Sequence, residues 1–374
     1  MRMLKNSLFC LLLTLPAFAA AVETPAASAA AEAMIERLGL REAARPSREL
    51  PGWKPPRKVV LRSGEAQWLE SLRAVAPGVE IVAVESVDAA LAEAADAQAL
   101  IGFCDQEIFA NAPQLHWVQV YSAGVERCVV HPGMQAGDKL LTNAQRIASP
   151  ALADTAIALM MALARGLDVY HRNQMQREWK REIDMGSGKL MELAGRTALV
   201  VGLGGIGTQA ARRAHGLGMR VIAIRNSRRS GPDYVGYVGL PDELLTLAAQ
   251  ADVVINTVPL TDATRGMYDA AFFAAMKPTA YFISVGRGAS TVTSDLVAAL
   301  ESGSIAGAGL DVTDPEPLPA DHVLWTLPRV LITPHTAARS GKTWARVFLL
   351  VQENLRRYVA GEPMLSVVDI ERGY

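Results

Sequence analysis

Cysteine, aromatic side chains and net charge are all scarce in this 374-residue chain. Only 3 cysteines occur, with no Cys-x-x-Cys pair and no metal-ligand spacing, so no metal site is expected. Aromatic residues make up 6% of the chain, which argues against a platform for stacking nucleic-acid bases. The net charge of -1 argues against nucleic acid or anionic lipid as the main partner. The hydrophobic share of 50% excludes disorder for most of the chain, and the length suggests two or three domains.

The N-terminus has the pattern of a secretory signal peptide. Arg2 and Lys5 precede an apolar run over residues 7–16, and Ala17-Phe18-Ala19 follows as a cleavage site. The run is too short to span a bilayer, which needs about 20 apolar residues. We therefore expect residues 1–21 to be removed, the protein to be exported to the periplasm, and no membrane attachment afterwards. The alternative is a cytoplasmic chain that starts at Met34.

Two cysteines, Cys104 and Cys128, remain after removal of the signal peptide. We expect both to be buried free thiols. A disulfide between them is the alternative in an oxidising compartment.

Alternating short apolar and helix-length segments organise the rest of the chain. Residues 22–57 are Ala-rich and then punctuated by proline, which predicts a linker with one short helix at Ala31–Leu40. The alternation that follows is typical of βαβ units in a parallel sheet. The strands predicted for a first sheet are Lys58–Leu61, Val79–Val84, Ala99–Gly102, Trp117–Val120 and Lys139–Thr142.

A second series of strands begins after a long helix predicted over Ala151–Arg165, which we expect to extend toward Lys180. The predicted strands are Thr197–Val201, Arg220–Ile224, Val253–Asn256, Ala280–Ser284, Ile305–Leu310 and Val330–Ile332. A terminal helix is predicted over Ser340–Val359. We predict an α/β protein with two doubly wound parallel-sheet domains. A Rossmann cofactor domain (159–337) is inserted in a flavodoxin-like substrate domain (58–158 and 338–374).

A glycine-rich turn between the strand at Thr197–Val201 and the following helix predicts dinucleotide binding. Gly202 allows a tight turn, Gly204 lets the backbone approach a pyrophosphate, and Gly207 permits close packing of helix and sheet. The helix N-terminus supplies N–H groups and a positive dipole to the phosphates. The residues expected to bind the cofactor here are Gly202, Gly204, Gly205, Ile206 and Gly207.

The end of the second strand predicts which dinucleotide is preferred. An NAD site places Asp or Glu there to accept a hydrogen bond from the ribose 2′-OH. This chain has Arg225, Asn226, Ser227, Arg228 and Arg229 instead. Guanidinium and small polar groups suit a 2′-phosphate, so we expect NADP to be preferred and NAD to be the alternative.

Three short stretches follow neighbouring strands of the second domain, and each carries one chemically active residue: Arg287, Glu316 or His335. In an open α/β sheet, ligands bind beyond the carboxyl ends of the strands, where all three residues would lie. Reduction of a 2-oxo acid needs a hydride for the carbonyl carbon and a proton for its oxygen, and His can give the proton. A carboxylate favours the imidazolium and orients the ring, and a guanidinium can grip the substrate carboxylate. We therefore predict all three residues to be catalytic.

With these motifs, the chain resembles the D-isomer-specific 2-hydroxyacid dehydrogenase family from about Lys58 to Gly361. The resemblance rests on residues 202–207, 285–288, 309–317 and 333–335. It implies that His335 is the acid/base, Glu316 its partner and Arg287 the anchor of the substrate. It also implies a homodimer joined through the cofactor domains. Further cofactor contacts are implied for Val258, Pro259, Val285, Gly286 and Asp311, and substrate contacts for Ser122, Ala123, Gly124 and Val125.

Two hypotheses for function follow. The first is NAD(P)H-dependent reduction of a small 2-oxo acid, such as glyoxylate or hydroxypyruvate, to the D-2-hydroxy acid. D-lactate or another D-2-hydroxyacid is the alternative substrate within that class. The second is a nucleotide-sensing, catalytically silent binding protein on the same fold. Export is at odds with the first hypothesis, because nicotinamide cofactor is expected to be scarce outside the cytoplasm.

Overall fold

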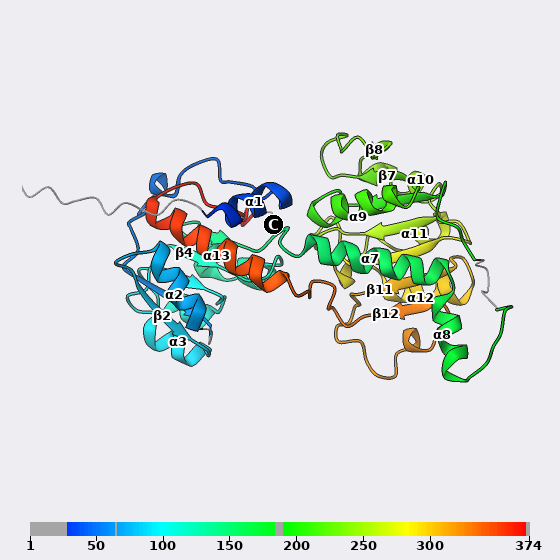
Figure 1. The fold of residues 1–374 in the computed structure, drawn as a ribbon, viewed down its shortest axis with the longest axis horizontal. Helices are drawn as coiled ribbons and strands as arrows, with labels where there is room; N and C mark the ends of the chain where they lie inside the picture. Colours follow the sequence, from blue (N-terminus) through cyan, green and yellow to red (C-terminus); the bar gives the residue numbers. More distant parts are fainter. Residues whose placement is uncertain (1–27, 64–65, 184–189, 372–374) are drawn as a thin grey trace, which may run out of the picture.

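Two parallel β-sheets, each covered by helices, form the two lobes of the molecule (Figure 1). The computed structural model describes residues 28–63, 66–183 and 190–371. The predicted signal peptide lies outside these ranges. In the described ranges, no helix combines the length and apolar character needed to cross a bilayer. The predicted fold class is confirmed: both domains are doubly wound α/β units.

The first domain has the strand order β2-β1-β3-β4-β5, and the neighbours run parallel. Its strands are nearly continuous apolar runs, as expected for a sheet buried on both faces. The strands are β1 (Lys58–Arg62), β2 (Glu80–Val84), β3 (Ala99–Ile101), β4 (Trp117–Gln119) and β5 (Leu140–Thr142). The helices are α1 (Ala29–Leu38), α2 (Ala66–Val75), α3 (Val87–Glu93), α4 (Gln106–Ala110), α5 (Glu126–Val129), α6 (Pro132–Gln135) and α13 (Thr343–Ala360).

The second domain has the strand order β12-β11-β10-β9-β6-β7-β8, also parallel throughout. One short edge strand, β8 (Tyr237–Gly239), was not predicted from the sequence. The other strands are β6 (Thr197–Val201), β7 (Arg220–Ile224), β9 (Val253–Asn256), β10 (Tyr281–Ser284), β11 (Gly307–Leu310) and β12 (Val330–Ile332). The helices are α7 (Ser149–Ala164), α8 (Leu167–Met175), α9 (Gly205–Gly216), α10 (Leu244–Ala248), α11 (Ala270–Ala275) and α12 (Thr293–Glu301).

The segment before β1 packs on the first domain, so the linker predicted for residues 22–57 is wrong for its described part. Helix α1 starts at an N-cap, Ser28, and ends at Gly39, which adopts a left-handed φ of 61°. Met34, Leu38 and Leu40 are buried in one cluster with residues of α13. Figure 1 shows α1 beside α13 in the first lobe. Each such burial contributes about 1.5–3 kcal/mol, which a solvated linker would not gain.

Helix α7 packs on α9, β10 and β11, and therefore lies wholly in the second domain. The boundary between the two domains, predicted between residues 158 and 159, therefore lies at the start of α7 instead. The helix also does not continue toward Lys180, because Gly166 takes a left-handed φ of 65° and α8 starts after it. Asp168 of α8 is buried and pairs with Arg329, which directly precedes β12. This ion pair therefore joins α8 to the sheet of the second domain.

Cys104 and Cys128 form a disulfide, with their Cα atoms 5.5 Å apart. The expectation of two free thiols is therefore wrong. The bond joins the segment after β3 to α5, which follows the loop at residues 121–126. The spacing of 24 residues gave no sign of this pairing, because only the sheet brings the two segments together.

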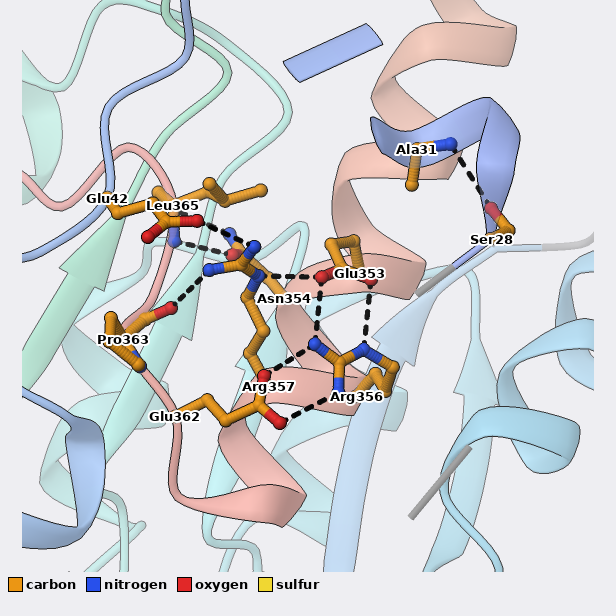
Figure 2. A network of polar contacts seen from close by, with 10 residues as sticks. All are labelled: Ser28, Ala31, Glu42, Glu353, Asn354, Arg356, Arg357, Glu362, Pro363 and Leu365. Atoms are coloured by element: carbon orange, nitrogen blue, oxygen red, sulfur yellow. Dashed lines mark hydrogen bonds and ion pairs between the residues drawn. The ribbon is translucent and has the colours of Figure 1, made fainter. Parts of the chain in front are cut away.

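A buried ionic network fixes the C-terminal part of α13 (Figure 2). The carboxylate of Glu353, with a side chain 2% exposed, accepts hydrogen bonds from both Arg356 and Arg357. Arg356 also pairs with Glu362, and Arg357 reaches Glu42 of the N-terminal segment. Every charged group in this network has a partner of opposite charge. The pairing offsets the free energy that burying these charges against the core would otherwise cost.

Candidate active site

The turn between β6 and α9 fits a dinucleotide pyrophosphate. Gly202 has a φ of 92°, a conformation that L-residues rarely adopt. A Cβ on Gly207 would collide with the carbonyl of Gly202 and lie 2.8 Å from Oγ1 of Thr257. A Cβ on Gly204 would meet nothing within 4 Å, so space is open at the point where the phosphates would approach. The first turn of α9, with Gly205 and Ile206, presents N–H groups toward that space.

A buried Asn at the end of β9 organises the neighbouring loops. Asn256 donates to Oγ of Ser284 (3.0 Å) and of Ser290 (2.9 Å). Its Oδ1 accepts from the N–H of Val258 and the hydroxyl of Tyr268, both at 3.1 Å. Asn256 was not predicted from the sequence as a functional residue, although a polar residue that ends an apolar strand was a usable signal.

This network lies beside two of the predicted cofactor segments. Val258 precedes Pro259, and a Cβ on Gly286, next to Val285, would lie 2.7 Å from the carbonyl of Val258. The structure therefore places 258–259 and 285–286 side by side, at the edge of the sheet that also carries the phosphate turn.

The basic stretch after β7 divides into two parts. Nη1 of Arg225 donates to the carbonyl of Ser230 (2.9 Å), and Asn226, Ser227 and Arg228 are exposed. Burial and the nearby charges of Arg228 and Arg41 lower the pKa of Arg225. Arg229 instead pairs with Glu243 and is not available for a phosphate. The guanidinium groups of Arg225 and Arg228 therefore remain available to an anion at the end of β7.

The structure brings His335 and Glu316 together. Nδ1 of His335 lies 2.6 Å from Oε1 of Glu316, and both side chains are more than two-fifths exposed, at 44% and 42%. The backbone N–H of His335 donates to the carbonyls of Asp311 and Thr333, each at 2.9 Å. The ring is therefore oriented by a carboxylate on one side and has its other nitrogen, Nε2, available for a substrate.

Asp311 holds the loop that carries His335. Its carboxylate, almost fully buried, accepts from the hydroxyl of Thr333 (2.6 Å) and from the N–H groups of Thr336 (3.0 Å) and Ala337 (3.1 Å). Asp311 was predicted as a cofactor contact. The hydrogen bonds in the structure are to this loop, so Asp311 also positions the catalytic candidate.

Arg287, in the second domain, contacts the first domain directly. Its Nε donates to Oε1 of Glu126 at 3.0 Å, and its Nη1 donates to the carbonyl of Gly286 at 2.9 Å. A Cβ on Gly124 would clash with Nη2 of Arg287 and lie 2.6 Å from Oε2 of Glu126. Arg287 is thus brought to the predicted substrate loop, as expected. The sequence did not show that Glu126 would be its partner.

The substrate loop is fixed by polar contacts at its ends. Oγ of Ser122 donates to the carbonyl of Gly124 (2.7 Å), and Nδ2 of Asn143 donates to the carbonyl of Ala123 (2.8 Å). The side chain of Val125 is buried. Within the described residues, the N–H groups of Ala123, Gly124 and Val125 have no backbone acceptor, so they can receive a carboxylate.

An aromatic groove of about 670 Å³ lies next to this loop. The ring centroid of Trp68 lies 5.9 Å from that of Tyr121 and 4.7 Å from that of Phe348. Trp344 is 60% exposed at the start of α13. This groove was not predicted from the sequence, because α2 and α13 are far apart in the chain. The groove is rich in aromatic side chains and adjoins the loop that is predicted to hold the substrate.

Comparisons with known proteins agree with the fold and with a dinucleotide-binding second domain. Residues 157–337 match the sequence family described as D-isomer specific 2-hydroxyacid dehydrogenase, NAD binding domain. Glyoxylate/hydroxypyruvate reductase A of Photorhabdus laumondii is 32% identical over 83% of this chain and 96% of its own length.

Two solved structures are similar over both domains. A D-isomer specific 2-hydroxyacid dehydrogenase from Xanthobacter autotrophicus, in complex with NADPH, has a TM-score of 0.73 and 28% identity over 85% of this chain and 100% of its own. An NADPH-dependent glyoxylate/hydroxypyruvate reductase from Sinorhizobium meliloti, in complex with NADP and sulfate, has a TM-score of 0.73 and 27% identity over 85% of this chain and 99% of its own.

The chain belongs to the D-isomer specific 2-hydroxyacid dehydrogenase family. It is an NAD(P)-dependent oxidoreductase of the class that interconverts small 2-oxo and 2-hydroxy acids.

Proposed function

We propose that this protein reduces glyoxylate or hydroxypyruvate to the 2-hydroxy acid, with NADPH as the preferred reductant and His335 as the acid. The observation that carries this proposal is the 2.6 Å contact between His335 and Glu316, in the same domain as Arg287 and the phosphate turn. The relatives from Photorhabdus laumondii and Sinorhizobium meliloti are glyoxylate/hydroxypyruvate reductases, which supports the substrate class. A nucleotide sensor has no use for the three side chains together.

In the proposed mechanism the protein binds the acid, orients it and gives one proton. The bound reduced nicotinamide supplies the hydride for the carbonyl carbon. Nε2 of His335 donates a proton to the carbonyl oxygen as the alcohol forms. Glu316, on Nδ1, favours the imidazolium and fixes the ring. Arg287 and the N–H groups of Gly124 and Val125 hold the substrate carboxylate.

The preference for NADPH is supported by Arg225 and Arg228, which stand where an NAD site has a carboxylate. Replacing Arg225→Asp should raise the KM for NADPH by about 10- to 100-fold and raise that for NADH much less, because a charge-assisted contact becomes a repulsion. Steady-state kinetics with both cofactors measure this. Equal effects on NADPH and NADH would contradict the assignment of the 2′-phosphate to Arg225.

The substrate is tested on protein that lacks residues 1–21, by the nicotinamide absorbance with glyoxylate, hydroxypyruvate, pyruvate and phenylpyruvate in turn. Faster turnover of glyoxylate and hydroxypyruvate than of pyruvate and phenylpyruvate is expected with NADPH. A preference for phenylpyruvate would instead assign the aromatic groove to the substrate side chain. Tight nucleotide binding without any turnover would favour the nucleotide-sensing alternative.

We also propose that the protein is exported. The signal-like residues 1–21 and the disulfide between Cys104 and Cys128 both suit an oxidising compartment. Cell fractionation with mass determination of the N-terminus tests this. Mature protein that starts near residue 22 is expected in the periplasm, whereas a cytoplasmic chain that starts at Met34 would contradict export.

A homodimer is proposed through the α7–α8 side of the second domain. Exposed apolar side chains gather on this part of the chain, including Leu167 (54% exposed), Met175 (72%) and Trp179 (93%). Such exposure is unfavourable in a monomer and typical of an interface. Light scattering should give twice the chain mass, and Trp179→Glu should lower it toward the monomer. A monomeric wild type would contradict the proposal.

A further inference from the structure

The loop that is predicted to hold the substrate carboxylate is fixed differently in its two halves. Its first half is held by hydrogen bonds from the segment after β5. Nδ2 of Asn143 donates to the carbonyl of Ala123 (2.8 Å), and the N–H of Ala144 donates to the carbonyl of Ser122 (2.9 Å). The second half, from Val125, runs directly into α5. The position of this half therefore depends on what holds α5.

Helix α5 is held mainly through Cys128. The helix is a single turn of four residues, and so short a helix is not stable by itself. Cys128 is its one buried side chain, at 3% exposed, whereas Glu126 and Arg127 are exposed. The N–H of Cys128 donates to the carbonyl of Val125 at 2.7 Å. The position of Cys128 therefore fixes the second half of the loop as well as the helix.

The partner of Cys128 comes from a segment that also touches the start of the loop. Cys104 follows β3 and is bonded to Cys128. A Cβ on Gly102 would lie 2.6 Å from the ring of Tyr121, so the backbone and this ring are in close contact. Residues 102–104 thus hold the chain on both sides of the N–H groups that are proposed to bind the carboxylate. The contact of Gly102 lies before these groups, and the disulfide lies after them.

We propose that the disulfide between Cys104 and Cys128 positions the substrate loop, so that the affinity for the 2-oxo acid depends on this bond. The N–H groups of Gly124 and Val125 bind a carboxylate well only when they are already in place, because ordering a loosened loop costs binding free energy. Both cysteines act through the loop and take no part in hydride or proton transfer. The inference rests on the proposed function, because it needs the loop to bind the substrate.

A dithiol reductant can open this bond. Because Cys104 is half-buried and Cys128 is buried, a thiolate of the reductant attacks Sγ of Cys104. The S–S bond breaks, and the sulfur of Cys128 leaves as a thiolate and takes up a proton. The second thiol of the reductant then displaces Cys104 and closes the reductant's own disulfide. The protein gains two electrons and two protons in all, and the loop is expected to loosen.

The kinetic test compares the full-length wild type, prepared without reductant, with Cys104→Ser. The variant should have a KM for glyoxylate raised about tenfold, with kcat and the Kd for NADPH changed by less than about twofold, because only the order of the loop is lost. Ile81→Ala is the matched control. Ile81 is a buried residue of β2, at the opposite edge of the sheet from β5, so its loss lowers stability away from the loop. The KM of this control should equal that of the wild type.

Amide hydrogen exchange tests the loop directly and needs no turnover. Treating the wild type with dithiothreitol should speed exchange in residues 121–130 about tenfold, and exchange in residues 197–216 of the second domain should not change. Should Cys104→Ser fail to fold, as thermal melting would show, the KM of the reduced wild type takes its place.

The proposal is overturned if breaking the bond changes the KM by less than twofold, or if Ile81→Ala raises it as much. Unchanged exchange in residues 121–130 after complete reduction would overturn it too, because the bond would then not hold the loop. A wild type that reduces no acid, but whose loop exchanges faster on reduction, would contradict the proposed function and leave the positioning of the loop by the disulfide intact.

Discussion

His335 has a left-handed backbone, with a φ of 51°, which few residues other than glycine adopt. The conformation is held by the two hydrogen bonds of its N–H group and by the carboxylate of Asp311, which fixes the following residues. The local strain is of the order of 1–3 kcal/mol and is typical of functional positions. It aims the ring at Glu316 and supports a catalytic role.

Replacing His335→Ala is expected to lower kcat by about 100- to 10,000-fold, because the proton donor is lost. The affinity for NADPH should stay near that of the wild type, since the ring is not part of the phosphate site. Stopped-flow absorbance and a fluorescence titration measure the two quantities. His322→Ala, in a surface loop of the same domain, should keep full activity. Undiminished turnover in His335→Ala would exclude His335 as the acid.

In the proposed mechanism, Glu126 competes with the substrate carboxylate for Arg287, because it occupies Nε of Arg287 and lies against Gly124. The proposal requires an incoming acid to displace it. Glu126→Gln should therefore lower the KM for glyoxylate by up to about fivefold, since exposed ion pairs are worth roughly 0.2–1 kcal/mol, with kcat little changed. Glu107→Gln, an exposed position of the same domain, should have no effect. A raised KM would mean that Glu126 helps to assemble the site.

Ion pairs stabilise the C-terminal end of α13. It stops at Gly361, with a φ of 69°, and the chain then turns back so that Glu362 meets Arg356 (Figure 2). The Arg356 guanidinium holds the pKa of Glu362 below its usual 4.5. Ionised Glu362 therefore stabilises the folded chain above that pH, and the contribution is lost as the pH falls through the lower, folded pKa.

Urea denaturation between about pH 6 and pH 3 should consequently show a shallower loss of stability for Glu362→Gln than for the wild type. The difference is expected to be modest, because the Glu362 side chain is 38% exposed and the ion pair is screened by solvent. At pH 7 the variant should be the less stable of the two. Parallel curves for the two proteins across this range would show that Glu362 makes no ionic contribution.

The elements themselves were largely predictable. Ten of the predicted strands match an observed strand to within one residue at each end, and Ile305–Leu310 is shortened to Gly307–Leu310. Buried parallel strands are unbroken apolar runs, which can be recognised without tertiary information. Strand β8, Tyr237–Gly239, was missed, because three residues at a sheet edge carry too little pattern. The end of α7 at Ala164 lies one residue from the predicted Arg165, and only the continuation toward Lys180 was wrong, because Gly166 interrupts the helical run.

At the scale of the whole molecule, the disulfide ties the end of β3 to α5 and so closes a loop of the first domain. Cys104→Ser should lower the free energy of unfolding by about 3 kcal/mol. The reason is that the disulfide restricts the unfolded chain, and a loop of this length loses conformational entropy worth about that free energy. Urea denaturation of the variant, and of the wild type with and without reductant, measures this. A wild type whose stability is insensitive to reductant, with two titratable thiols, would contradict the disulfide.

The sequence by itself determined the family of this protein and the place of its phosphate turn. The turn is contiguous, and Arg287, Glu316 and His335 each follow a strand, so the rule that ligands bind at the carboxyl edge of a parallel sheet was enough to predict one site, of which the structure shows the contact between Glu316 and His335. Local patterns of this kind need no knowledge of distant contacts.

Only the tertiary structure decided which distant groups meet. The packing of Met34 and Leu38 on α13, the pairing of Cys104 with Cys128 and the contact of Glu126 with Arg287 join segments that are far apart in the chain. Such contacts leave no periodic trace in either partner segment, because they depend on how two folded surfaces fit together.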